Sequence, residues 1–77
     1  MENDYLLKLR KEIEEKRAYL NKLLAEKDEL INEINNSKSQ QDIQKLKGML
    51  QISVAKFQKL DAEVSRLLSK IKNIQNI

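Results

Sequence analysis

Carboxylates are the side chains in this sequence best placed to do chemistry, as oxygen ligands for a hard cation. Two acidic clusters lie in the first half of the chain: Glu12, Glu14 and Glu15, followed by Asp28, Glu29 and Glu33. Calcium and magnesium take oxygen ligands, but these residues lack the loop spacing of an EF-hand. Acidic clusters on a helix surface are usually only hydrated. We therefore expect no metal ligands and no cofactor.

The composition also excludes the common catalytic centres. The 77 residues include no Cys, His, Trp or Pro, and only one Gly. Without Cys there is no disulfide and no thiol nucleophile, and Ser–His or Cys–His catalysis has no base. The usual ligands of zinc, haem and iron–sulfur clusters are missing as well. We expect a protein that is not an enzyme, with no catalytic residues and no small-molecule substrate.

The same composition is typical of long helices and coiled coils. The chain is 40% hydrophobic, 35% charged and 4% aromatic, and its length allows one small domain over residues 1–77. Apolar runs such as residues 5–7 are far too short to span a bilayer, and the acidic start lacks the features of a signal peptide. We expect a cytoplasmic protein with no membrane partner.

The elements that must position these side chains follow from the apolar spacing. In the second half, two series with seven-residue spacing are offset by three residues: Ile43, Leu50, Phe57, Val64 and Ile71, and Leu46, Ser53, Leu60, Leu67 and Ile74. Only Ser53 is not apolar, so this segment has the heptad pattern of a helix that buries one stripe.

The first half repeats the spacing with two interruptions. Its series are Leu6, Ile13, Leu20, Lys27 and Ile34, and Leu9, Lys16, Leu23 and Leu30. The methylene stem of a Lys can cover apolar surface while its ammonium stays hydrated, so Lys16 and Lys27 are compatible with the stripe. Glu12 and Lys16 have the spacing of a helical ion pair, and Asn3 or Asp4 is suited to cap the helix.

A polar cluster separates the two patterns and predicts a reversal of the chain. Residues 35–41 are the one concentration of Asn, Ser and Gln, and Ile34 and Ile43 are nine residues apart, which breaks the heptad register. Ser39 is suited to cap the second helix. We therefore predict an all-α, antiparallel, coiled-coil-like hairpin, with a helix over about 4–34, a turn over about 35–40 and a helix over about 41–75.

The charges of the two halves favour this pairing. Residues 1–37 carry seven basic and nine acidic side chains, a balance of −2, and residues 38–77 carry eight and three, a balance of +5. The second helix also has a row without charge, made of Gln44, Gly48, Gln51, Ala55, Gln58, Ala62, Ser65 and Ser69. Such a row is either an ordinary hydrated face or a place where another helix approaches closely.

The apolar face is wider than a two-helix seam requires, which predicts a partner. Chains of this size hold little stability without staples or association. We expect a four-helix bundle, completed by a homodimer of hairpins or by helices of another protein. The expected partner-binding residues are Leu24, Ile31, Met49, Val54, Phe57, Leu60, Val64 and Leu68. The resulting hypothesis is a non-enzymatic interaction module that acts as adaptor, assembly subunit or small chaperone.

A resemblance supplies an alternative function. Residues 13–21, IEEKRAYLN, look like the first helix of the small aspartyl-phosphate phosphatases of the sporulation phosphorelay, which are short helical hairpins. Residues 57–61, FQKLD, are the nearest match to the Ser-Gln-Glu-Leu-Asp motif of that family; they keep the Gln, Leu and Asp but lack the Ser and Glu. The resemblance implies a regulator of a phosphorelay, with Gln58 and Asp61 as the residues to test.

Two further comparisons concern architecture and charge. The predicted hairpin is similar in architecture to small co-chaperones of secretion systems that hold aggregation-prone helical subunits. The pI of about 9.2 leaves weak nucleic-acid binding through the basic second helix as a third alternative. The basic residues of that half are spread around the helix and few aromatic residues are available for base stacking, so nucleic acid is not the partner we expect.

Overall fold

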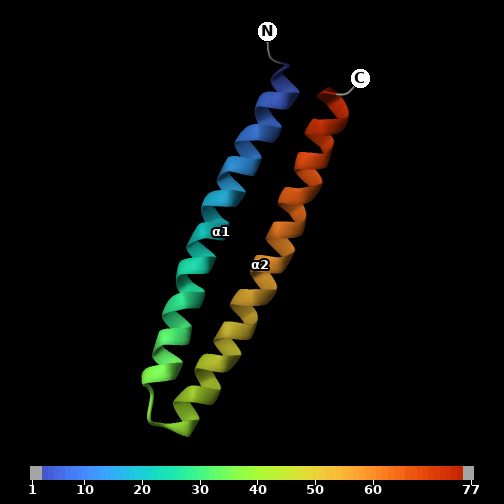
Figure 1. Cartoon of the computed structure of the whole chain (residues 1–77). Coiled ribbons are helices and arrows are strands. Elements are labelled where there is room, and N and C mark those ends of the chain that lie inside the picture. Colours follow the sequence, from blue (N-terminus) through green and yellow to red (C-terminus); the bar gives the residue numbers. More distant parts are fainter. Residues whose placement is uncertain (1–2, 76–77) are drawn as a thin grey trace.

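The computed structural model describes residues 3–75 and shows a two-helix hairpin (Figure 1). Helix α1 spans Asp4–Asn36 and helix α2 spans Gln40–Gln75. The helices lie side by side and run in opposite directions, so the start of α1 and the end of α2 meet at the end opposite the turn. The Cα atoms of the described residues extend over 58 × 16 × 13 Å. The predicted all-α hairpin is confirmed.

Helix α1 begins with the cap that its sequence suggests. The side-chain oxygen Oδ1 of Asn3 accepts a hydrogen bond from the backbone N–H of Tyr5 at 3.0 Å. This satisfies one of the N–H groups that a helix start leaves without an intrahelical partner. Asp4 follows in the first turn, where a negative charge complements the helix dipole. Of the two candidate caps, the structure uses Asn3.

The turn is shorter than the polar cluster suggests, because Asn35 and Asn36 continue α1. The last helical residue is Asn36; Ser37 follows as the C-cap, has extended backbone angles and donates its N–H to the Ile34 carbonyl at 3.4 Å. Residues 37–39 make the reversal. The hydroxyl of Ser39 accepts a bond from the Asp42 N–H at 3.4 Å, so Ser39 caps α2 as predicted.

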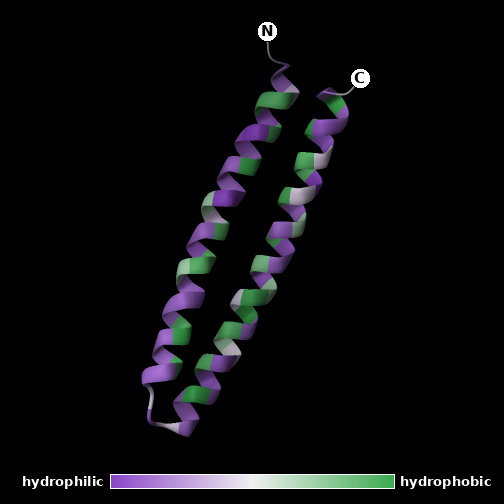
Figure 2. Cartoon of the chain, viewed as in Figure 1, coloured by the Kyte–Doolittle hydropathy of each residue, from purple (hydrophilic) through white to green (hydrophobic). Residues whose placement is uncertain are grey.

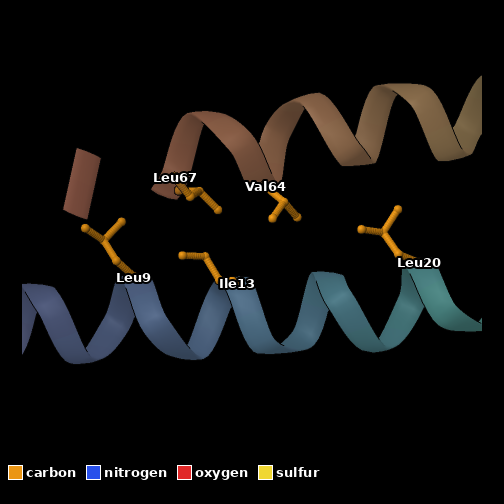
Figure 3. Close-up of a cluster of buried hydrophobic side chains, with 5 residues drawn as sticks. All are labelled: Leu9, Ile13, Leu20, Val64 and Leu67. Carbon is orange, nitrogen blue, oxygen red and sulfur yellow. The ribbon is translucent and has the colours of Figure 1, made fainter. Parts of the chain in front are cut away.

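The core is a single seam between the helices, built from the predicted heptad positions. Figure 3 shows side chains of α1 and α2 pointing toward one another across this seam; the buried cluster comprises Leu9, Ile13, Leu20, Val64 and Leu67. All other members of the two heptad patterns are buried or half-buried, including Lys16 and Lys27. Among the described residues, no large side chain is completely enclosed. The seam therefore gives the hairpin a thin core.

Most of the described residues outside the seam are exposed to solvent. Figure 2 shows hydrophobic residues as separated bands along both helices, with hydrophilic residues between them. Neither described helix contains an apolar segment long enough to cross a membrane. Apolar side chains that stay exposed outside the seam identify candidate contact surfaces.

Candidate protein-interaction surface

The residues predicted to bind a partner divide into seam residues and surface residues. Val64 is 5% exposed and belongs to the core cluster, and Phe57 and Leu60 are half-buried against it. While the hairpin is intact, Val64 cannot also face a partner, because its side chain already packs between α1 and α2. The remaining candidates are exposed, apart from the half-buried Val54: Leu24, Ile31, Met49, Val54 and Leu68.

Leu24 and Val54 mark one side of the hairpin, where they line a groove of about 190 Å³. The floor of this groove is formed by seam residues, among them Leu23 and Phe57. Two further exposed residues share this side, because residues seven apart lie nearly on the same helix face. Ile31 follows Leu24 by seven residues, and Leu68 follows Val54 by fourteen. We call the side that carries Leu24, Ile31, Val54 and Leu68 the aliphatic side.

The uncharged row of α2 borders the aliphatic side. Gln51 and Gln58 are exposed, and Gln58 also lines the groove beside Val54. Next to them the helix surface is made of small residues, including Ala55 and Ala62. A Cβ added at Gly48 would meet nothing within 4 Å, so the space over this part of α2 is open. A neighbouring helix could therefore lie close to α2 without displacing a charged side chain.

The opposite side of the hairpin is dominated by charge. The Nζ atom of Lys16 lies 3.0 Å from Oε2 of Glu63 across the seam and 3.9 Å from Oε1 of Glu12 in its own helix. Arg66 and Lys70 line the same shallow depression. We call the side that carries Glu12, Lys16, Glu63, Arg66 and Lys70 the charged side. The Glu12–Lys16 pair predicted from spacing is present.

The neighbouring charges shift the pKa of Glu63. The hydrogen bond and the positive charge of Lys16 lower the pKa of Glu63, partial burial opposes them, and the charges of Lys59 and Arg66 lower the pKa further. A hydrogen bond to the ionised carboxylate and nearby cations both favour the charged form. The carboxylate is partly exposed, with a side-chain exposure of 36%, so the pair contributes little to the stability of the hairpin.

Apolar residues are also present on the charged side, and sequence reasoning misses the most exposed of them. Ile52 is 60% exposed and lines a groove of about 210 Å³ together with Met49 and Lys56. Met49 is one of the expected partner-binding residues, but it lies here, apart from Leu24 and its neighbours. Ile52 lies just before the seam position Ser53, so a heptad count does not select it. Its signal is a large β-branched residue at a position that the pattern leaves to solvent.

Ser53 is the polar residue at the centre of both grooves. It is 7% exposed, it occupies a seam position, and its hydroxyl has no hydrogen-bond partner among residues 3–75. It lines the groove of the aliphatic side and the groove of the Met49–Ile52 pair. A Ser is smaller than the apolar residue that the heptad pattern calls for. The seam is therefore less completely filled at Ser53, and a groove is present there on each side of the hairpin.

The candidate chemical residues are exposed on helix surfaces. Within residues 3–75, no group of three or more acidic residues is arranged to hold a metal ion. Gln58 and Asp61, which the phosphatase resemblance selects, are exposed on α2, and Gln58 lies beside the groove of the aliphatic side.

Comparison with known protein families, with curated proteins and with solved structures finds no match to this chain. Its own geometry defines a helical hairpin with one aliphatic and one charged side.

Proposed function

We propose that this chain is a non-enzymatic protein–protein interaction module, an adaptor, assembly subunit or small chaperone that docks its apolar helical face on helices. The observation that carries the proposal is the aliphatic side. Leu24, Ile31 and Leu68 are 39%, 39% and 41% exposed, and they share a side with the groove beside Val54. Aligned exposed aliphatic side chains on a small protein usually mark a contact surface.

The energetics support docking because the hairpin core is thin. Complete burial of a Leu or Ile side chain contributes about 1.5 to 3 kcal/mol, so covering the exposed part of one such residue contributes about 1 kcal/mol. Several of these residues acting together, with the groove floor, can offset the entropy lost on association. A helix that packs here would extend the seam into a bundle, which is the usual way in which helices of this kind complete a core.

The mechanism follows the helix-in-groove mode of recognition. An amphipathic helix would lay its apolar face along the aliphatic side and insert side chains into the groove between Leu24 and Val54. Charged residues on the same side would then select orientation and partner. Arg17 lies seven residues before Leu24, and Asp61 lies seven residues after Val54. Both are exposed, so they can attract or repel a helix that lies along this side.

A photo-cross-linking experiment tests this function whatever the identity of the partner. Benzoylphenylalanine is placed at Leu24, on the aliphatic side, or at Ala18, an exposed position on the back of α1. The proposal predicts a discrete protein cross-link from position 24, to this chain or to another, and none from position 18. Both variants must retain the helical circular dichroism of the parent chain. No cross-link from position 24, or the same products from both positions, would contradict the proposed function.

A second experiment separates docking from folding. The double variant Leu24→Ser, Leu68→Ser changes only exposed residues, whereas Val64→Ser places a hydroxyl in the seam. We expect the double variant to lose the cross-linked product formed by a probe at Ile31, on the same side, and to keep its helicity. Val64→Ser should lose both, because a buried unpaired hydroxyl and a cavity destabilise the hairpin itself. Retention of the product by the double variant would count against the aliphatic side as the docking surface.

A further inference from the structure

We propose that the aliphatic side is covered by a second copy of this chain, with the two hairpins parallel and α1 of each copy lying on α2 of the other. This inference rests on the proposed function and names its partner. It follows from four observations: the distribution of charge between the two sides, the levels of the residues along the hairpin, the opposite charge of the two helices and the size of the face.

The charge distribution selects the side. Burial of the charged side would remove water from the Lys16–Glu63 pair and from the neighbouring Arg66 and Lys70. Desolvation of such groups commonly costs more than their attraction returns. On the aliphatic side, the groove is lined by Leu23, Leu24, Val54 and Phe57 together with Lys27, Ser53 and Gln58, and the charged residues Arg17, Lys47 and Asp61 are spaced between the aliphatic ones. The aliphatic side is therefore the less costly of the two to cover, and its charged residues need opposite charges in the interface.

The register of the helices sets which residues lie at the same level. Leu24 and Val54 line one groove, so they are level with each other. Because the helices are antiparallel and rise equally per residue, a step of seven residues back in α1 matches a step of seven forward in α2. Arg17 is therefore level with Asp61. By the same reasoning, Ile31 is level with Lys47, seven residues in the other direction.

A two-fold axis parallel to the long axis of the hairpin brings each residue of α1 onto the residue of α2 at the same level in the second copy. Rotation about that axis places α1 over α2 of the second copy at the same level. Leu24 packs on Val54 of the second copy, and Arg17 lies on Asp61 of the second copy. The Ile31 side chain covers the methylene stem of Lys47 of the second copy. Each contact occurs twice, as a two-fold symmetric interface requires.

The charges of whole helices favour this orientation over the reverse one. Residues 1–37 have a balance of −2 and residues 38–77 a balance of +5. In the parallel arrangement, each helix faces one of opposite net charge, and the positive Arg17 that α1 presents on this side meets Asp61 of the second copy. If the second hairpin ran in the opposite direction, α1 would lie on α1 and α2 on α2, so the two basic helices would repel each other.

The size of the face fits a stable dimer. The Cα atoms of the described residues extend 58 by 16 Å along the two longer axes, an outline of roughly 900 Å² per copy. A standard protein–protein interface buries about 800 Å² on each partner. One second copy is therefore enough to cover the face, and the product is a four-helix bundle in which every neighbouring pair of helices is antiparallel.

A spin-label distance measurement tests the orientation directly. The chain has no Cys, so Lys38→Cys, in the exposed turn, carries one label per copy. The parallel dimer predicts a single interlabel distance comparable with the 16 Å width of the hairpin plus the label tethers. A distance comparable with the 58 Å length would show the reverse orientation and overturn the proposal. Absence of dipolar coupling at concentrations where sedimentation equilibrium also shows a monomer would overturn it too.

Charge exchange tests the predicted contact itself. Arg17→Glu alone and Asp61→Lys alone each place like charges at the same level of the interface twice, so we expect each variant to dimerise about tenfold more weakly. In a heterodimer of the two variants, the introduced carboxylate lies on the introduced ammonium, and the unchanged Arg17 of one copy lies on the unchanged Asp61 of the other. An equimolar mixture should therefore associate with nearly native affinity. Failure of the mixture to recover association would overturn the predicted alignment.

A matched pair of isoleucine variants tests the choice of side. Ile31→Ser removes an exposed aliphatic side chain from the aliphatic side, and Ile52→Ser removes one from the other side. We expect Ile31→Ser to weaken the dimer about tenfold and Ile52→Ser to leave it unchanged; the reverse result would overturn the proposal. A discrete cross-link from Leu24 to a different protein, with a monomeric chain, would overturn this inference and leave the proposed function standing. If no cross-link forms from position 24, both this inference and the proposed function are wrong.

Discussion

Replacement of Ser53 by alanine is a direct test of the packing described for the seam. Ser53 is the one polar member of the heptad series in α2; it is 7% exposed, and its hydroxyl has no hydrogen-bond partner within residues 3–75. Water hydrogen-bonds to this hydroxyl in the unfolded chain but is largely excluded from it in the hairpin. Folding therefore carries a desolvation cost that alanine would not have.

The expected gain in stability has two parts. Removal of a buried unsatisfied hydroxyl contributes about 1 to 3 kcal/mol to the free energy of unfolding. The higher helix propensity of Ala adds roughly half a kcal/mol, since Ser lies in the middle of the propensity scale. Ser65→Ala is the matched control, because Ser65 is exposed on the same helix and gains only the propensity part. The difference between the two variants therefore isolates the effect of burial.

Urea unfolding followed by circular dichroism measures both variants at the same low protein concentration, so that association contributes equally. Ser53→Ala should raise the urea midpoint clearly more than Ser65→Ala does, with an unchanged slope. Equal midpoints for the two variants would show that the Ser53 hydroxyl is satisfied in solution and would refute the reasoning about the seam. Ser53→Leu should raise stability further, because the grooves on both sides of Ser53 leave room for the larger side chain.

Three other predictions concern the ion pair, the helix start and the glycine. The pKa of Glu63 is lowered in the hairpin, so the ionised carboxylate stabilises the folded state at a pH above the pKa of the unfolded carboxyl. This stabilisation is lost as the pH falls through the pKa of the folded state. The difference in thermal midpoint between the parent chain and Glu63→Gln should therefore shrink as the pH is lowered from about 7 to about 2. Asn3→Ala should lower the free energy of unfolding by about 1 kcal/mol, as measured by urea unfolding, because the Tyr5 N–H loses its acceptor. Gly48→Ala should raise the urea midpoint by an amount equivalent to about 1 kcal/mol, since the position is helical and a Cβ meets open space.

Some features of the surface could be predicted from the sequence and others could not. Leu24, Ile31 and Leu68 flank the heptad stripe, so periodicity alone identifies them as apolar positions beside the seam, and the structure finds them exposed. The sequence also places Val64 against a partner, but the seam already buries it, because periodicity cannot tell which apolar residues the chain covers with its own second helix. Ile52 escapes the pattern since it falls outside the heptad positions.

The sequence by itself determined the helices, the reversal and the seam. Seven-residue spacing, a polar interruption and capping residues act within a short stretch of the chain, so they define a helix and its ends before any tertiary contact is known. The tertiary structure alone decided how the surface is divided. Met49 and Val54 flank the stripe of α2 on opposite edges, as their heptad positions require, but only antiparallel packing against α1 puts Val54 beside Leu24 and Met49 beside Glu26. The physical reason is that a side of a hairpin is made by two helices, and its composition depends on which levels of α1 and α2 face each other.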